Sequence, residues 1–287
     1  MGFAARARFD WRLRTRTLAL GERTVLMAIV NLTPDSFSGD GLASASLDAV
    51  ARIAVERLDG GADILDLGAE STRPGAEPLS VDAEQDRLLP VLEAVLRERP
   101  AAIVSVDTYH ASTGRAAARA GAEIVNDVSG LLWDEAMAVV VAEERTGLVL
   151  MHTRGRPAEW RTQAPLAAGD VLPVVLDGLR QRLAVALAAG IAPENIVLDP
   201  GFGFGKRGVE NFALLAGFSR LAELGRPVLA GLSRKSFLGQ AGVSERVNAT
   251  MVANVAAILA GAHIVRVHDL QEARETAAIA DAILAQS

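Results

Sequence analysis

The sequence of 287 residues contains no cysteine, which excludes disulfide bonds and thiolate metal sites. No apolar stretch reaches the roughly 18 uninterrupted residues that a membrane-spanning helix requires. The arginine-rich start, Met1 to Arg16, lacks the apolar segment of a secretory signal. We therefore expect a cytoplasmic protein with no membrane partner.

The net charge is -6, so the sequence offers no broad basic surface. A nucleic-acid partner is not expected, although a few cations at one mouth of the fold could still bind a small anion. Half of the residues are hydrophobic and 22% are charged, which is typical of a globular protein with a large core. The length suits a single domain spanning residues 1–287.

Short apolar, β-branched runs recur along the chain, and each ends at a polar residue or a glycine turn. The predicted strands are Val25–Asn31, Asp63–Gly68, Ile103–Asp107, Ile124–Asn126, Leu148–His152, Ile196–Asp199, Val228–Ser233 and Ile264–His268. The predicted helices that follow them are Leu47–Leu58, Ala83–Arg97, Ser112–Ala120, Glu135–Arg145, Val171–Ala189, Asn211–Leu224, Ala249–Ala260 and Glu272–Leu284. This alternation predicts an α/β fold, a (β/α)8 TIM barrel.

Three further segments have a predicted place in this barrel. Phe9 to Leu20 alternates in part and precedes Gly21-Glu22, which indicates a short N-terminal β-hairpin that closes the bottom of the barrel. The long loops Asn31–Ala45 and Ala69–Val81 are rich in Gly, Pro, Ser and Asp, and we expect them to act as mobile lids.

Polar side chains end several of the predicted strands. Asp107, Asn126 and Asp199 end three of them, and carboxylates with an amide suit a flat heterocycle that carries N–H donors. The alternative is that each residue only caps the helix that follows. Since the active site of a TIM barrel lies at the carboxyl ends of its strands, we favour a shared cavity.

Cations from separate loops are expected at the same mouth: Arg73, Lys235, Arg266 and His268. Arg266 lies within a predicted strand, where a buried guanidinium needs an anion, an aromatic plane or, alternatively, a salt bridge inside the barrel. Three other cations are expected at the surface or behind the site, and they are Lys206, Arg207 and Arg234.

The glycine-rich segment from Gly201 to Lys206 does not fit a phosphate-binding loop, because Pro200 and Arg207 stand where that motif needs glycine and Ser or Thr. Its glycines would let the backbone approach a ligand, with Phe204 available to stack on a ring. Among the four histidines, only His268 is assigned a direct role.

Eight of these segments occur in a characteristic order. They are Asn31-Leu-Thr-Pro-Asp-Ser-Phe-Ser38, Glu70-Ser-Thr-Arg-Pro-Gly-Ala76, Ser105-Val-Asp-Thr108, Asn126-Asp-Val-Ser-Gly130, Leu150-Met-His152, Leu198-Asp-Pro-Gly-Phe-Gly-Phe-Gly-Lys206, Ser233-Arg-Lys-Ser236 and Arg266-Val-His-Asp269. Together they resemble the dihydropteroate synthase family. The resemblance implies a transferase that condenses 6-hydroxymethyl-7,8-dihydropterin diphosphate with p-aminobenzoate, giving 7,8-dihydropteroate and pyrophosphate for folate biosynthesis.

The resemblance also implies ligand roles for individual residues. The pterin would be bound by Asp107, Asn126, Val128, Met151, Asp199, Gly231, Lys235 and Arg266. The diphosphate would be bound by Asn31, Arg73, Arg266 and His268, with Mg2+ held there by Asn31. The p-aminobenzoate pocket would comprise Phe37, Thr72, Pro74, Phe204 and Ser236. The catalytic residues would be Asp107, Lys235, Arg73 and His268. A homodimer and sulfonamide binding are further implications.

Two other functions are compatible with such a barrel. A pterin-binding methyltransferase would use the same carboxylates and amide but has no need of Arg73, Lys235 and His268. A paralogue that binds pterin without catalysis is expected to lose a lid motif, and both motifs are present. The predicted helix Ala249–Ala260 is apolar over much of its circumference, which fits either an oligomer interface or a helix enclosed by its neighbours.

Overall fold

Parallel strands form the centre of the molecule. The computed structural model describes residues 3–32, 47–70, 78–239, 242 and 246–286. Within these ranges an eight-stranded parallel sheet has the order β8-β7-β6-β5-β4-β3-β10-β9. A parallel bridge between Leu198 and Val228 joins its two ends, so the sheet closes into the predicted barrel. The strands are β3 (Val25–Asn31), β4 (Ile64–Gly68), β5 (Val104–Asp107), β6 (Ile124–Asp127), β7 (Gly147–Met151), β8 (Ile196–Asp199), β9 (Leu229–Ala230) and β10 (Ile264–Val267).

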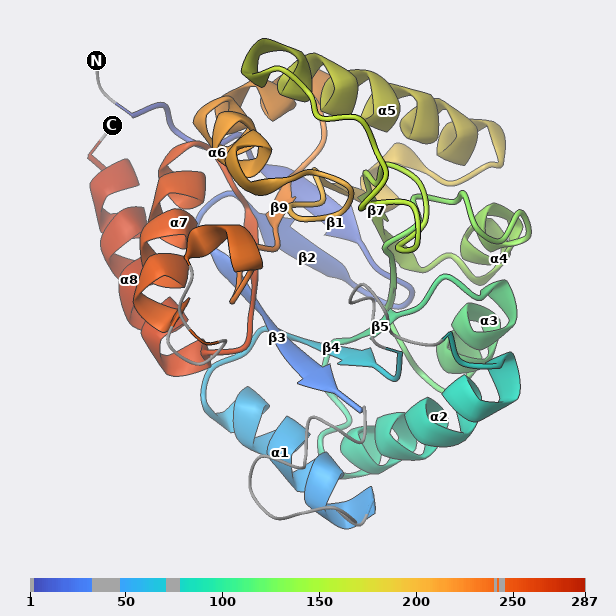
Figure 1. Cartoon of the computed structure of the whole chain (residues 1–287). Coiled ribbons are helices and arrows are strands. Elements are labelled where there is room, and N and C mark those ends of the chain that lie inside the picture. The colour runs from blue at the N-terminus through green and yellow to red at the C-terminus, as the bar shows by residue number, and fades with distance from the viewer. Residues whose placement is uncertain (1–2, 33–46, 71–77, 240–241, 243–245, 287) are drawn as a thin grey trace.

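Helices surround these strands as a ring, which Figure 1 shows. They are α1 (Leu47–Asp59), α2 (Val81–Glu98), α3 (Ala111–Arg119), α4 (Met137–Glu144), α5 (Ala168–Ala188), α6 (Gly208–Ala216), α7 (Val247–Leu259) and α8 (Leu270–Leu284). Among the residues that the structure describes, no helix has both the length and the apolar character needed to cross a membrane. The cytoplasmic location stays a prediction from the sequence.

The predicted hairpin is present as β1 (Phe9–Arg12) and β2 (Thr17–Leu20), an antiparallel pair. Trp11 is fully buried, and its indole Nε1 donates to the carbonyl oxygen of Asn195 at 2.8 Å. Trp11 and Leu20 pack against apolar residues from the amino-terminal halves of the strands, among them Ile64 and Ile264. The hairpin therefore closes the bottom of the barrel, as predicted.

The predicted sixth helix and seventh strand end earlier than expected. The sixth helix ends at Ala216 and continues after Gly217 as the 3-10 helix η4 (Phe218–Leu224); Gly217 packs closely on α5, where an added Cβ would lie 2.6 Å from Leu172 Cδ2. The seventh strand pairs with β10 only at Leu229 and Ala230. Beyond them the Ser233 hydroxyl accepts the backbone N–H of His268 at 3.1 Å, so a side-chain hydrogen bond takes the place of the backbone hydrogen bonds between the two strands.

A polar layer lies directly above the apolar layer that packs on the hairpin. Side chains alternate along a strand, so residues two positions apart point to the same side. Four apolar residues of the lower layer are each followed, two positions later, by a polar residue of the upper layer. The pairs are Ile64 and Asp66, Ile124 and Asn126, Val197 and Asp199, and Ile264 and Arg266. The carboxyl half of the barrel interior is therefore polar.

Candidate functional site

Arg266 is at the centre of the polar layer. Its Nε donates to Asp66 Oδ2 at 2.6 Å, and its Nη2 donates to Asp107 Oδ2 at 2.7 Å. The salt bridge inside the barrel, which the sequence offered as one alternative for Arg266, is therefore present. Two carboxylates flank one guanidinium, so this cluster carries a net negative charge when both are ionised.

Asp66 is the residue of this cluster that sequence reasoning missed. Its side chain is fully buried, and its Oδ1 has no hydrogen-bond partner among the described residues. The carboxylates and the amide predicted for the site, Asp107, Asn126 and Asp199, came from strand ends, whereas Asp66 lies in the middle of β4. A charge of the opposite sign in the middle of another strand, Arg266, was the signal that could have identified it.

Asn126 is held by the same carboxylate, because its Nδ2 donates to Asp66 Oδ2 at 3.0 Å. This bond fixes the amide so that its carbonyl oxygen remains an acceptor. The N-cap positions of the helices that follow Asp107 and Asn126 are occupied by other residues, His110 for α3 and Ala136 for α4. For these two side chains the helix-capping alternative is wrong.

Asp199 also does not cap the next helix, since the residue at the start of α6 is Arg207. Its Oδ1 accepts the backbone N–H of Gly201 at 2.7 Å, which fixes the turn after β8. A Cβ on Gly231 would lie 3.6 Å from Asp199 Oδ2, so the backbone after β9 passes close to this carboxylate. The site thus collects side chains from β4, β5, β6, β8 and β10.

Burial controls the protonation of these groups. It raises the pKa of Asp107 to about 7, since the loss of solvent outweighs the attraction of Arg266 and the nearby Asp66 carboxylate adds to the effect. Burial likewise raises the pKa of Asp199. Although burial disfavours its charge, Arg266 has a raised pKa because of the carboxylates of Asp66 and Asp107.

Lys235 lies beside Asp199 and Phe204. Its Nζ is 4.3 Å from the centroid of the Phe204 ring, within the range of a cation–π contact. Its charge opposes the rise of the Asp199 pKa, although burial dominates. Lys235 and Phe204, which the sequence assigned to different subsites, are therefore adjacent.

His268 is held by Ser233. The Ser233 hydroxyl accepts the backbone N–H of His268 and lies 3.0 Å from its Nδ1. Burial and the neighbouring Arg266 lower the pKa of His268 to about 3, so the ring is neutral at pH 7. Because the hydroxyl can donate to Nδ1, this arrangement favours the tautomer with the proton on Nε2.

The remaining predicted residues lie at the same end of the barrel or outside the described ranges. Asn31 is half-buried at the end of β3, where it pairs with Gly68 of β4. Val128 and Met151 are buried at strand ends, and Ser236 is exposed at the start of the 3-10 helix η5 (Ser236–Leu238). Outside the described residues lie Phe37, Thr72, Arg73 and Pro74, with most of both predicted lids.

No group of three or more His, Asp or Glu side chains suited to a metal ion occurs in the part of the chain that the structure describes. A metal held entirely by the protein therefore has no support from these residues. An ion that is coordinated mainly by substrate phosphate and water needs fewer protein ligands.

Comparisons with known proteins agree with this geometry. A family model described as "Pterin binding enzyme" matches residues 27–268. The dihydropteroate synthase of Bacillus subtilis is 42% identical over 270 residues, which cover 93% of this chain and 91% of that protein.

Two solved structures have the same fold. Dihydropteroate synthase from Xanthomonas albilineans with 4-aminobenzoic acid is 39% identical, with a TM-score of 0.86 over 96% of this chain and 99% of the other. The Yersinia pestis enzyme with a sulfonamide drug is 37% identical, with a TM-score of 0.87 over 96% and 98% of the two chains. The chain therefore belongs to the dihydropteroate synthase family of pterin-binding enzymes.

Proposed function

We propose that this chain is a dihydropteroate synthase, a transferase that joins 6-hydroxymethyl-7,8-dihydropterin diphosphate to p-aminobenzoate. One observation supports this most strongly: the buried cluster of Asp107, Asn126, Arg266 and Asp66 at the carboxyl end of the barrel strands. A cluster with surplus carboxylates and an amide acceptor suits a ring that presents several N–H donors. Family membership supports the same reaction.

The pterin ring would bind to Asp107, Asn126, Asp199 and Lys235, beside Gly231, Val128 and Met151. Asp107 and Asp199 accept N–H groups of the ring, and the carbonyl oxygen of Asn126 accepts a third. The Arg266 guanidinium is paired with two carboxylates, which offset much of its charge, and its planar face would stack on the ring.

The diphosphate would bind at the ends of β3 and β10, where Asn31 and His268 lie. Since His268 is neutral, it would contribute an N–H donor instead of a positive charge. Arg73 would supply that charge from the second loop, with a further contribution from Arg266.

Mg2+ fits this subsite only as an ion that arrives with the substrate, because Asn31 is the one side-chain oxygen assigned to it. Such an ion would neutralise charge on the departing diphosphate. Asn31 would hold it through its amide oxygen.

The second substrate, p-aminobenzoate, would bind against Phe204 and Ser236, with Phe37, Thr72 and Pro74 from the two loops. Phe204 is half-buried and next to Lys235, so its ring is positioned between the two subsites. Sulfonamides, which imitate p-aminobenzoate, would compete for the same place.

In the proposed mechanism the bond between the exocyclic carbon of the pterin and the diphosphate oxygen breaks first, and the oxygen keeps the electron pair. Asp107 and Asp199 offset the cation that is left on the pterin. The amine of p-aminobenzoate then donates its lone pair to this carbon, and the released proton passes to water or pyrophosphate. Lys235 contributes its positive charge near the reacting edge of the ring.

A pyrophosphate-release assay tests the function. Release that requires both substrates and yields 7,8-dihydropteroate is expected. Absence of product, with pterin binding intact, would instead identify a non-catalytic binding protein. Slow pyrophosphate exchange with the diphosphate ester alone is expected from the stepwise mechanism, and its complete absence would favour a concerted displacement.

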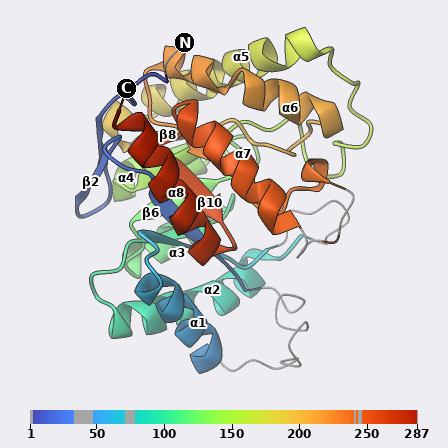
Figure 2. The ribbon, with the colours of Figure 1, turned by 90° about the vertical axis from the view of Figure 1, so that its left-hand side faces the viewer.

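We further propose that two copies of this chain associate through α7 and α8, which lie side by side in Figure 2. Val252 on α7 is 73% exposed, and Ile279 on α8 is 62% exposed. Exposed apolar side chains on adjacent helices are typical of an interface. Sedimentation equilibrium should give a dimer mass, and Val252→Glu combined with Ile279→Glu should give a monomer; a monomeric wild-type chain would refute the proposal.

A further inference from the structure

The sequence contains only two lysines, Lys206 and Lys235, among 29 lysine and arginine side chains. Arginine occupies every other cationic position of these two types. An ammonium is a compact point charge with three donors, whereas a guanidinium is a planar fork. The two positions that retain lysine lie on neighbouring loops at the same end of the barrel, next to β8 and β9.

Lys206 is buried and donates to three backbone carbonyl oxygens. Its Nζ lies 2.7 Å from the oxygen of Gly201, 3.1 Å from that of Phe204 and 3.3 Å from that of His152. Only 4% of the residue is exposed. Three donors therefore meet three acceptors, and two of these belong to the loop on which Lys206 itself lies.

This loop packs directly on the loop after β7. Gly201 and Gly205 have positive φ angles of 67° and 70°. A Cβ on either glycine would clash with the neighbouring loop: it would lie 2.0 Å from the His152 carbonyl oxygen at Gly201, and 2.6 Å from Arg154 Cβ at Gly205. The sequence associated these glycines with a ligand, but at these two positions the close approach is to protein. Lys206 lies where the two loops meet, and its ammonium donates hydrogen bonds to carbonyl oxygens of both loops.

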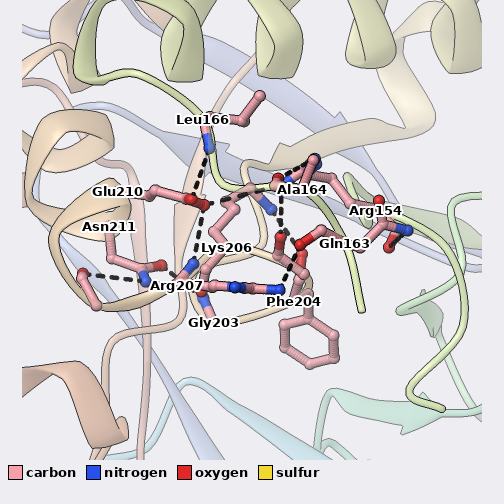
Figure 3. Close-up of polar contacts among 12 residues, drawn as sticks. Arg154, Gln163, Ala164, Leu166, Gly203, Phe204, Lys206, Arg207, Glu210 and Asn211 are labelled. Atoms are coloured by element: carbon pink, nitrogen blue, oxygen red, sulfur yellow. Dashed lines mark hydrogen bonds and ion pairs between the residues drawn. The ribbon is translucent and has the colours of Figure 1, made fainter. Parts of the chain in front are cut away.

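Side chains around Lys206 add further hydrogen bonds to the loop from Gly201 to Lys206, as Figure 3 shows. Asn211 accepts the N–H of Gly203 at 2.7 Å and donates to the carbonyl of Lys206 at 3.0 Å. Arg154 donates to the carbonyl of Gly205 at 3.1 Å and to that of Ala164 at 3.0 Å. The loop from Gly201 to Lys206 is thus fixed along its whole length.

Burying the charge of Lys206 costs desolvation free energy, which indicates that the ammonium has a role at this position. Burial, together with the charges of Lys235 and Arg154, lowers the pKa of Lys206 to about 7, although Asp199 and Glu210 act in the opposite direction. Methionine could fill a similar volume without that cost. The ammonium offers what an apolar side chain cannot, hydrogen bonds to three backbone carbonyls, although one of them, that of Gly201, also accepts the N–H of Phe204 at 3.1 Å.

Phe204 is the residue that this loop presents to the site. Its ring makes an edge contact with Trp160 at 5.0 Å between centroids and lies 4.3 Å from Lys235 Nζ. Its carbonyl is one of the three bound by Lys206. The position of the ring therefore depends on the geometry around the Lys206 ammonium.

We infer that Lys206 is a positioning residue for the second substrate: its buried ammonium gathers three carbonyls, sets the loop from Gly201 to Lys206, and thereby places the Phe204 ring against Lys235 in the p-aminobenzoate subsite. This deepens the proposed function and rests on it. Lys206 touches no substrate and reaches the second substrate through Phe204, while its charge also opposes the rise of the Asp199 pKa.

Lysine-selective isotope labelling tests the inference without reference to activity. Wild-type protein should give two side-chain ε-CH2 signals, and Lys206→Met should leave only that of Lys235. In the wild type the Phe204 ring shields the Lys235 signal, and Phe204→Leu gives the unshielded position. We expect Lys206→Met to move the Lys235 signal to that unshielded position, whereas an unmoved signal would overturn the inference.

Kinetics with both substrates give the second readout. Lys206→Met should raise KM for p-aminobenzoate about tenfold, since a displacement of about 1 Å can cost up to about a hundredfold. Affinity for the pterin substrate should stay within roughly twofold, because Phe204 contacts the pterin subsite through Lys235 and is not itself assigned to bind the pterin. Equal losses for both substrates would mean that Lys206 only supports the fold.

Arg207→Met is the matched control, because it removes a neighbouring exposed cation that binds the carbonyls of Arg161 and Gln163 from outside. It should leave the Lys235 signal and KM unchanged. If Lys206→Met does not fold, the wild-type protein still decides. At about pH 5.5, below its pKa of about 7, Lys206 should have ammonium protons that exchange more slowly than those of Lys235, and equally rapid exchange of both would contradict the inference. An inactive wild type would refute the proposed function while leaving the lysine signals readable.

Discussion

Arg266 Nε and Asp66 Oδ2 form a 2.6 Å hydrogen-bonded ion pair between β10 and β4, across the intervening strand β3. The same Asp66 oxygen accepts the amide of Asn126, and the same guanidinium binds Asp107. Asp66 therefore orients residues of two other strands, Arg266 on β10 and Asn126 on β6, while it is fully buried itself. Its role is to hold the groups that would contact the pterin.

Asp66→Asn should destabilise the protein by about 2 kcal/mol, less than the roughly 3–5 kcal/mol expected when a buried charge loses its only partner, because Arg266 keeps Asp107. Asp59→Asn is the control, since its ion pair with Arg99 is exposed and should contribute little to stability. Urea denaturation measures both. Equal stabilities of the two variants would contradict the assigned role.

Pterin binding should depend on the protonation of Asp107. The carboxylate must be ionised to accept N–H groups of the ring, and its pKa is raised to about 7. Affinity should therefore increase as the pH rises through 7, and should fall about tenfold for each pH unit well below it. Calorimetric titrations of wild type and Asp107→Asn between about pH 5.5 and 8.5 check this. A slope that persists in the variant would assign the titration to another group.

Ser233→Ala should weaken the diphosphate subsite. Without the hydroxyl, Nδ1 of His268 loses its partner and the ring no longer favours the proton on Nε2. We expect the affinity for the pterin diphosphate to fall about tenfold, equivalent to about 1.4 kcal/mol. The pterin alcohol, which lacks the diphosphate, serves as the control ligand and should bind as it does to wild type. An equal loss for both ligands would refute the assignment.

The sequence predicted the barrel because the buried parallel strands are apolar runs that end at a polar residue or a glycine turn. The same pattern identified Asp107, Asn126 and Asp199, because these polar side chains lie at the ends of strands. It missed Asp66, which lies within a strand, because a rule based on strand ends does not consider strand interiors.

Lys206 was assigned to the surface or to a place behind the site, and its burial shows that the first alternative is wrong. Single-residue chemistry makes lysine a surface residue by default. Only the convergence of two loops, from β7 and β8, reveals the three carbonyls that its ammonium binds. Contacts between distant loops of this kind are not encoded in any local pattern.

The central claim is that the polar layer of the barrel binds a pterin, and Asp199→Asn tests it most directly. The substitution keeps an oxygen for the Gly201 N–H and replaces the other carboxylate oxygen with an N–H2 donor. Titration of both proteins with the pterin diphosphate should show binding to wild type and a loss of about a hundredfold in the variant, since unpaired buried donors are costly. Equal affinities would contradict the account.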